Sequence, residues 1–204
     1  MAKISTILLL SSFFFIALSS TCAIAKGLNE EKSWREAFCQ GKETTTKLHF
    51  YLQDVLGGPN ATVWEVAKSP ISNSATSFGQ IRVLDDLITR TPNPNSKKLG
   101  RAQGLITFAD LDVSALNMNL NFVFTAGRYN GSTLTILGRN QIMNVDRELP
   151  VVGGTGIFRM ARGYAISNTY SYNVSTNYGI LEYTVYVIHT DVSKVNNIQM
   201  VMDA

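Results

Sequence analysis

The chain has 204 residues with a formal net charge of +3, from 18 Lys and Arg and 15 Asp and Glu residues. A charge this close to neutral excludes the strongly basic character that indicates a nucleic-acid partner. Hydrophobic residues make up 45% of the sequence, so the chain can bury a sizeable core and fits one folded domain after a leader.

Residues 1–25 predict a signal peptide. Lys3 supplies a small positive charge, residues 7–18 are apolar except for two serines, and residues 23–25 form a small-x-small cleavage site. We expect the mature protein to start near Lys26 and to be secreted. An uncleaved anchor is the alternative, but the apolar stretch is short for a membrane span, which needs about 20 residues.

The positions of the cysteines and of the glycosylation sequons indicate which covalent modifications a secreted form of this chain can have. Loss of the leader removes Cys22 and leaves Cys39 without an intrachain partner, so Cys39 is buried, free or available for an intermolecular bond. Three Asn-x-Ser/Thr sequons lie in turn-like sequence, which suits surface loops. The predicted glycosylation sites are Asn60, Asn130 and Asn173.

Residues 26–46 are polar and charged, and we expect a flexible N-terminal arm there, followed by one β-domain over residues 47–204. Beyond the arm, short runs of β-branched and aromatic residues alternate with clusters of Gly, Pro and Asn. No helix longer than two turns is indicated. The predicted strands are 47–54, 61–68, 77–85, 101–109, 116–126, 132–139, 157–168 and 179–190.

The strand spacing favours a closed sheet. Asn130-Gly131 between two alternating runs is a strong hairpin signal, and Leu120 and Phe122 alternate with asparagines in the strand before it. Strands without helices to cover them favour an eight-stranded antiparallel β-barrel, which removes exposed edges and encloses a cavity for one small ligand. A two-sheet sandwich is the alternative.

The run 147–164 is the most distinctive stretch. Val151 and Val152 lead into Gly153-Gly154-Thr155-Gly156, which predicts a strand-like segment entering a tight turn. Beyond the turn, both alternating sets of residues contain an arginine, so neither face of the next strand is purely apolar. This pattern is compatible with a polar cavity on one side.

The residue inventory argues against metal and nucleophile chemistry. Only His49 and His189 are present and no haem motif occurs, so neither a metal nor another cofactor is expected. No Gly-x-Ser-x-Gly elbow occurs, and Cys39 lies in the arm. Asp54 is of more interest because it ends an apolar strand, where a carboxylate is either costly to bury or caps the strand at the surface.

Five segments taken together resemble the plant dirigent protein family. They lie in the family's order at residues 50–54, 59–62, 100–104, 138–140 and 147–164. The resemblance implies an eight-stranded antiparallel β-barrel of the allene-oxide-cyclase type, assembled as a homodimer or homotrimer. It also implies a phenolic radical or a quinone methide as the ligand.

The resemblance implies catalytic roles for named residues. Asp54 falls on a family aspartate that donates or accepts a proton, and Arg147 falls on an arginine that positions a substrate oxygen. Lignan-forming members have a second aspartate where this chain has Asn140, which can donate and accept hydrogen bonds but cannot deliver a proton. Asn140 stays a candidate catalytic residue, and the nearby Asp146 is the candidate substitute for the proton transfer. Residues 105–108 also lack the family tyrosine, for which Tyr51, Tyr164 and Tyr183 are the candidate replacements. These departures predict a branch distinct from the pinoresinol-forming members.

A flat phenolic ligand suits a cavity lined by aromatic side chains. We expect such side chains at the barrel mouth, and the alternative for each one is barrel filling or packing on the outer surface. The predicted substrate-binding residues are Phe50, Phe122, Phe124, Phe158 and Tyr164.

The implied function is stereoselective coupling of phenoxy radicals, from coniferyl-alcohol-type monolignols to optically active lignans, in the apoplast or cell wall. Coupling needs orientation, and a bias of about 1.4 kcal/mol already gives a tenfold preference. A separate laccase or peroxidase performs the oxidation, so this protein is expected to direct stereochemistry without oxidising the substrate itself. Two alternatives stay open, a cyclase or dehydratase acting on an isoflavonoid-type quinone methide, and a glycan-binding cell-wall barrel.

Overall fold

The computed structural model describes residues 41–71 and 75–191. The predicted signal peptide, Cys39 and most of the predicted arm lie outside the described residues. Among the described residues, no helix is long and apolar enough to cross a membrane.

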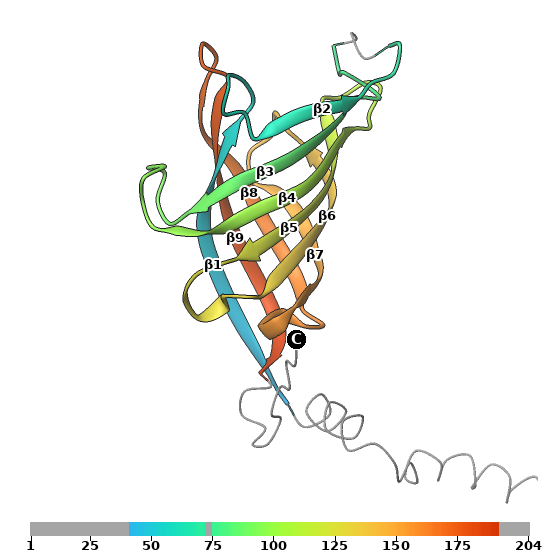
Figure 1. Ribbon diagram of the computed structural model, residues 1–204. Coiled ribbons are helices and arrows are strands. Elements are labelled where there is room, and N and C mark those ends of the chain that lie inside the picture. The colour runs from blue at the N-terminus through green and yellow to red at the C-terminus, as the bar shows by residue number, and fades with distance from the viewer. Residues whose placement is uncertain (1–40, 72–74, 192–204) are drawn as a thin grey trace, which may run out of the picture. The chain divides into compact units, whose positions relative to one another are not determined.

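Nearly all regular structure in the described residues is β-strand, with two short 3₁₀ turns, η1 (Gly127–Tyr129) and η2 (Gly156–Phe158). Figure 1 shows β1 and β9 running side by side along the molecule, with β2 beside β3 at the upper rim. The strands are β1 (Lys42–Val55), β2 (Val63–Ala67), β3 (Ile81–Thr89), β4 (Lys98–Phe108), β5 (Ala115–Phe124), β6 (Thr133–Gln141), β7 (Arg147–Thr155), β8 (Arg162–Asn173) and β9 (Tyr178–Asp191).

The sheet closes into the predicted eight-stranded antiparallel barrel. Its strand order is β1-β9-β8-β7-β6-β5-β4-β3-β2, and an additional pairing of β1 with β3 completes the ring. The closing pairs include Tyr51 with Thr89 and Gln53 with Leu87. β2 is the extra strand, because it pairs with the opposite end of β3 through Val63 and Leu84. β1 and β2 therefore meet β3 one after the other and leave the β3 edge covered.

Several predicted boundaries are wrong, including the strand 77–85, which the structure places at Ile81–Thr89. β1 begins at Lys42, so the end of the predicted arm is already strand and pairs with β9. The predicted strand 157–168 begins only at Arg162, because residues 156–158 form η2. The run 147–155, interpreted as a lead-in to a tight turn, is a full strand of the barrel.

The glycines of β7 explain the error in the start of the predicted strand 157–168. A side-chain carbon at Gly154 would lie 2.4 Å from the Thr133 carbonyl oxygen and 2.8 Å from Phe158 Cβ. Gly154 is therefore required by the close approach of its neighbours within the strand, and the change of direction waits until Gly156, whose φ is +61°. From the sequence alone, a run of glycines does not show whether a glycine is required by close packing within a strand or by a positive φ at a turn.

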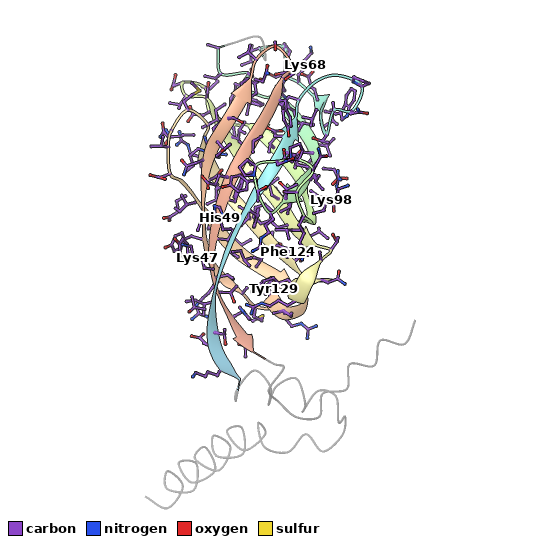
Figure 2. All side chains as sticks on the ribbon, turned by 90° about the vertical axis from the view of Figure 1, so that its left-hand side faces the viewer. Lys47, His49, Lys68, Lys98, Phe124 and Tyr129 are labelled. Carbon is purple, nitrogen blue, oxygen red and sulfur yellow. The ribbon has the colours of Figure 1, made fainter. Side chains whose placement is uncertain are left out.

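Aromatic side chains fill one half of the barrel. Phe50 lies with its ring centroid 5.1 Å from Phe122 and 6.0 Å from Tyr183, and Phe124 lies 5.7 Å from Phe158. All five side chains are buried. Figure 2 shows Phe124 and Tyr129 towards one end of the barrel and Lys68, just after β2, at the other. The open space of the barrel lies beyond this packed cluster.

Candidate functional site

The hollow half of the barrel holds a cavity of about 570 Å³. A volume of this size suits one drug-sized organic ligand. Most of its wall is apolar, with a few polar side chains from β1, β3, β6, β7, β8 and β9. The lining residues are Leu52, Asp54, Leu56, Arg82, Leu84, Asp86, Ile106, Phe108, Leu116, Met118, Leu120, Asn140, Ile142, Met143, Asn144, Val145, Arg147, Asn168, Thr169, Tyr172, Gly179, Leu181 and Tyr183.

Two carboxyl groups meet on one wall of this cavity. Asp54 lies near the end of β1 and Asp86 lies in β3, one residue beyond the last β1–β3 pair, Gln53 with Leu87. Asp86 is buried, with 2% of its surface exposed, and Asp54 is half-buried. The strand pairing that closes the barrel is thus what brings the two acids together.

Burial changes the acidity of both groups. Desolvation raises the pKa of Asp54 to about 6, against a lowering contribution from the positive charge of Arg82. Desolvation and the charge of Asp54 raise the pKa of Asp86 to about 8. Because the two groups interact electrostatically, the pair as a whole holds one proton between about pH 6 and 8. A pair in that state supplies one acid and one base.

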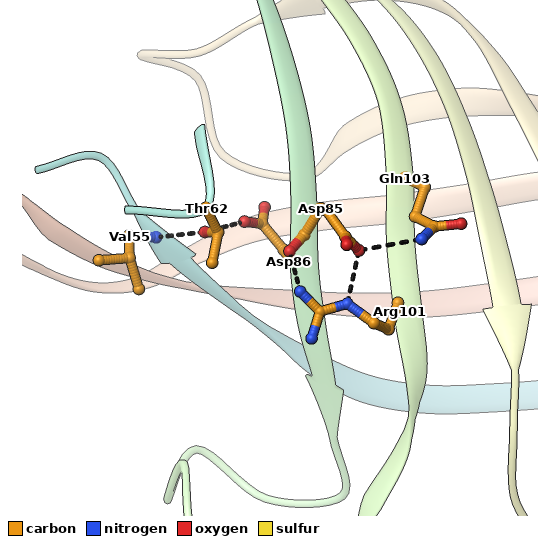
Figure 3. A network of polar contacts seen from close by, with 6 residues as sticks. All are labelled: Val55, Thr62, Asp85, Asp86, Arg101 and Gln103. Atoms are coloured by element: carbon orange, nitrogen blue, oxygen red, sulfur yellow. Dashed lines mark hydrogen bonds and ion pairs between the residues drawn. The ribbon is translucent and has the colours of Figure 1, made fainter. Parts of the chain in front are cut away.

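A polar network holds the Asp86 side of the wall (Figure 3). Thr62 Oγ1 donates to Asp86 Oδ1 at 2.5 Å and accepts the backbone N–H of Val55 at 3.1 Å. On the outer face, Arg101 Nε donates to Asp85 Oδ1 at 2.5 Å. Successive β3 side chains point to opposite faces, so Asp85 takes the surface ion pair while Asp86 faces the cavity.

Hydrogen-bond donors gather around Arg147 at the start of β7. The guanidinium is buried and donates through Nη1 to the carbonyl oxygens of Ile142 at 2.8 Å and Asn144 at 3.2 Å. It also reaches the hydroxyl groups of Thr169 and Ser167, at 3.1 and 3.3 Å. Desolvation lowers the pKa of Arg147, but an arginine in this state still carries its charge.

Unpaired polar atoms mark the same region. Four buried side-chain polar atoms of the described residues lack a hydrogen-bond partner of normal geometry, and three of them belong to cavity residues, Asn140 Oδ1, Arg147 Nε and Tyr183 Oη. Burial raises the pKa of Tyr183, against lowering contributions from Ser167 and Arg147. Leaving such groups unpaired costs about 1–3 kcal/mol each, a cost that a polar ligand would remove.

The structure brings together three of the four predicted catalytic residues. Asp54, Arg147 and Asn140 all line the cavity. Asp146 does not, because it is exposed at the end of the β6–β7 loop, where its backbone N–H donates to Asn168 Oδ1 at 2.7 Å. The second carboxylate is Asp86, which the sequence reasoning missed. The alternation of Leu84, Asp86 and Ile88 along β3 was the available signal, since it places all three on the inner face.

The predicted aromatic residues lie elsewhere. Phe50, Phe122, Phe124 and Phe158 form the packed half of the barrel and are absent from the cavity lining. Tyr164 is exposed on the outer wall, where its ring stacks on Tyr186 with centroids 5.0 Å apart. Alternation within a strand shows which side chains face the interior, but it does not show at which level along the barrel axis they lie. The four phenylalanines face the interior at the packed level and not at the level of the cavity. The aromatic residues that do line the cavity are Phe108, Tyr172 and Tyr183.

The remaining predictions concern the surface and metals. Asn60, Asn130 and Asn173 are all exposed, and their glycosylation stays a prediction. Within residues 41–71 and 75–191, no group of three or more His, Cys, Asp or Glu side chains is arranged to hold a metal ion.

The fold and the cavity define a class, a closed antiparallel barrel that encloses an acid pair opposite a cluster of hydrogen-bond donors. Its family is given by sequence: the dirigent-like protein family model matches residues 45–188. Dirigent protein 21 of Arabidopsis thaliana is 38% identical over 93% of this chain and 100% of its own length. The chain belongs to the dirigent family, as the resemblance predicted.

Two further relatives carry a specific activity in their names. Pterocarpan synthase 1 of Glycine max is 41% identical, covering 72% of this chain and 81% of its own length. A solved structure of a pterocarpan synthase dirigent protein, GePTS1, is 41% identical, with a TM-score of 0.69 over 74% of this chain and 87% of its own.

Proposed function

We propose that this protein binds a quinone methide and directs its stereospecific ring closure by proton transfer, without any oxidant. The observation that carries the proposal is the Asp54–Asp86 pair in an apolar cavity that also contains Arg147 and Tyr183. The similarity to pterocarpan synthases supports it. Among the interpretations of the sequence, the alternative of a quinone-methide cyclase is thereby favoured over radical coupling.

The chemistry is an isomerisation that these residues can serve. A hydroxyl oxygen of the ligand attacks the exocyclic carbon of the quinone methide, a C–O bond forms, and an electron pair moves onto the quinone-methide oxygen. The ionised member of the acid pair accepts the hydroxyl proton, and the protonated member or a donor near Arg147 supplies a proton to the new phenolate. Arg147 stabilises the developing negative charge. No electron leaves the ligand.

Stereoselective radical coupling is the second candidate, and the size of the cavity favours it. A volume of about 570 Å³ accommodates a ligand with two linked aromatic rings. Coupling of two phenoxy radicals made by a separate laccase or peroxidase yields a quinone methide, which then needs the same proton transfers. Both candidates therefore use Asp54, Asp86 and Arg147.

Chiral chromatography of products separates the two candidates. A precursor of the isoflavanol type gives the quinone methide when its benzylic C–O bond breaks and the hydroxyl leaves as water. Incubated with the protein and no oxidant, it should give one enantiomer of the cyclised product. Asp86→Asn should remove this selectivity, and Asp146→Asn is the matched control because Asp146 lies outside the cavity. Selectivity that appears only with coniferyl alcohol and an oxidase would overturn the cyclase proposal and support radical coupling.

We propose further that the protein is secreted to the apoplast and is glycosylated. The leader-like residues 1–25 and the exposed Asn60, Asn130 and Asn173 support this. Expression in plant cells should yield extracellular protein whose mass falls on treatment with an N-glycosidase. Retention in the cytosol would contradict the proposal.

Assembly into a homo-oligomer is proposed from the outer wall. Trp64, Val83, Leu105 and Leu137 lie on one row across the sheet from β2 to β6, and each is between 40% and 58% exposed. The exposed Asn119 of β5 stands between Leu105 and Leu137, so the row is largely but not wholly apolar. An exposed row of this kind suits an interface between subunits. Sedimentation analysis should find an oligomer that Leu105→Asp dissociates, and a monomeric wild-type protein would contradict this.

A further inference from the structure

We infer that the hydroxyl group of Thr62 is a positioning group for Asp86, fixing one oxygen of this carboxyl group in the cavity wall. This inference rests on the proposed function for its catalytic consequence, but its geometry and its first test do not. Thr62 precedes β2 and does not line the cavity itself, so it acts through Asp86.

Thr62 is bound at four points to the two strands that carry the acids. Its backbone N–H donates to the Val55 carbonyl oxygen at 2.8 Å, and its own carbonyl accepts the Asp85 N–H at 2.9 Å. Its hydroxyl oxygen accepts the Val55 N–H at 3.1 Å and donates to Asp86 Oδ1 at 2.5 Å. Val55 follows Asp54 and Asp85 precedes Asp86, so Thr62 connects the neighbours of both acids (Figure 3).

The direction of the hydroxyl bond follows from this arrangement. The Val55 N–H occupies a lone pair of the Thr62 oxygen, which leaves the hydroxyl proton to be donated to Asp86. A donated bond favours the ionised carboxylate. Thr62 accordingly lowers the pKa of Asp86, as does the charge of Arg101, against the raising effects of burial, Asp54 and Asp85. The carboxyl is thereby kept within reach of neutral pH while one of its oxygens is fixed in place.

In the described part of the chain, Asp54 differs from Asp86 in this respect. Its carboxyl makes no hydrogen bond or ion pair there, and only the more distant charge of Arg82 lowers its pKa. One acid of the pair is therefore held by a dedicated hydroxyl, and the other is held by no hydrogen bond from the described residues.

Thr62 is also the third residue of the predicted sequon that begins at Asn60. A substitution that removes its hydroxyl would also remove any glycan on Asn60, so the two effects must be separated. Asn60→Gln removes the sequon and keeps the hydroxyl, while Thr62→Ser keeps both. These two variants are the matched controls for Thr62→Val, which preserves the shape of the side chain and loses only the hydroxyl.

The first test is an NMR titration of the Asp86 side-chain carboxyl in the full chain, which requires no substrate. Thr62→Val should raise the apparent pKa of Asp86 by about one pH unit, whereas Thr62→Ser and Asn60→Gln should leave it close to that of the wild-type protein. An unchanged pKa in folded Thr62→Val would overturn the inference. If that variant does not fold, the smaller Thr62→Ala is titrated with the same two outcomes.

The second test is the pH profile of oxidant-free cyclisation. Thr62→Val should move the alkaline limb about one pH unit upward and lower the rate near neutral pH about tenfold, and Thr62→Ser should restore both. If wild-type protein shows no cyclisation while the titration still shifts, the proposed function fails and the positioning role stands. An unshifted alkaline limb in an active, folded Thr62→Val protein would overturn the inference.

Discussion

At the scale of single residues, the site depends on carboxyl groups that folding makes less acidic. Asp54 and Asp86 both keep their protons to higher pH in the folded protein than an exposed aspartate does, because burial disfavours their charged forms. The folded state therefore binds more protons than the unfolded state between about pH 4 and 8. The free energy of unfolding contributed by the pair decreases as the pH rises through this range.

A prediction about thermal stability follows for this pair. Asp86→Asn should remove most of the decrease in the free energy of unfolding between about pH 4 and 8, because an amide has no charge to bury. At pH 8.5 we expect the Tm of this variant to exceed that of the wild-type protein by on the order of 5 °C, with a much smaller difference at pH 4. Scanning calorimetry at the two pH values measures it, and an equal difference at both would contradict the linkage.

Three polar residues of the cavity wall were predictable at this scale, and the second carboxyl group was not. Asp54, Arg147 and Asn140 were identified from the dirigent resemblance, and all three line the cavity. Asp86 was missed because the predicted strand 77–85 ends before it, whereas β3 extends to Thr89. With the strand placed correctly, alternation puts Asp86 on the inner face with Leu84 and Ile88, and Asp85 on the outer wall.

At the scale of elements, β7 and the loop before it determine the shape of the cavity mouth. The loop residues Met143 and Val145 are 83% and 79% exposed, yet both line the cavity. Arg147 holds this loop from inside through the carbonyl oxygens of Ile142 and Asn144. An apolar ligand that reaches the mouth would cover side chains that water now surrounds.

We therefore expect these two side chains to contribute to binding without taking part in proton transfer. Met143→Asn combined with Val145→Thr should raise KM about tenfold, since covering each apolar side chain contributes about 1 kcal/mol or less, and kcat should stay within about twofold. Steady-state kinetics of oxidant-free cyclisation measure both constants. A fall in kcat with an unchanged KM would show that the loop acts on the reaction instead of on binding.

The different space around the two neighbouring glycines of β7 gives a second prediction for this strand. Gly154→Ala should lower the free energy of unfolding by about 1–3 kcal/mol, because the added carbon meets the Thr133 carbonyl and Phe158. Gly153→Ala is the matched control, because no atom lies within 4 Å of a side-chain carbon at Gly153. Urea denaturation compares the two, and equal stability would show that the strand accommodates the extra atom.

At the scale of the whole molecule, the barrel is packed in one half and hollow in the other. The sequence patterns predicted strands, closure and an interior, because alternation reports which side chains face inward. They did not predict which inward residues pack against one another and which face a cavity. Phe50, Phe122, Phe124 and Phe158 were assigned to the ligand for this reason, and the structure places them in the packed half.

The separation of the barrel into a packed half and a hollow half also allows one fold to provide both a stable core and a binding cavity. The aromatic cluster, which includes Tyr183, supplies buried apolar contacts at one depth. Tyr183 also borders the cavity, where its hydroxyl makes no hydrogen bond of normal geometry with the described residues. Rigid packing behind the site holds the polar groups in fixed positions, which favours one ligand geometry over its mirror image.

The pH dependence of oxidant-free cyclisation tests the central claim most directly, because it reports the one proton that the Asp54–Asp86 pair holds. In wild-type protein, kcat/KM for a preformed quinone-methide precursor should follow a bell-shaped curve with limbs near pH 6 and 8. Asp86→Asn should abolish the alkaline limb and lower the rate about a hundredfold or more. A rate that is independent of pH from 5 to 9, or unaffected by Asp86→Asn, would contradict the account.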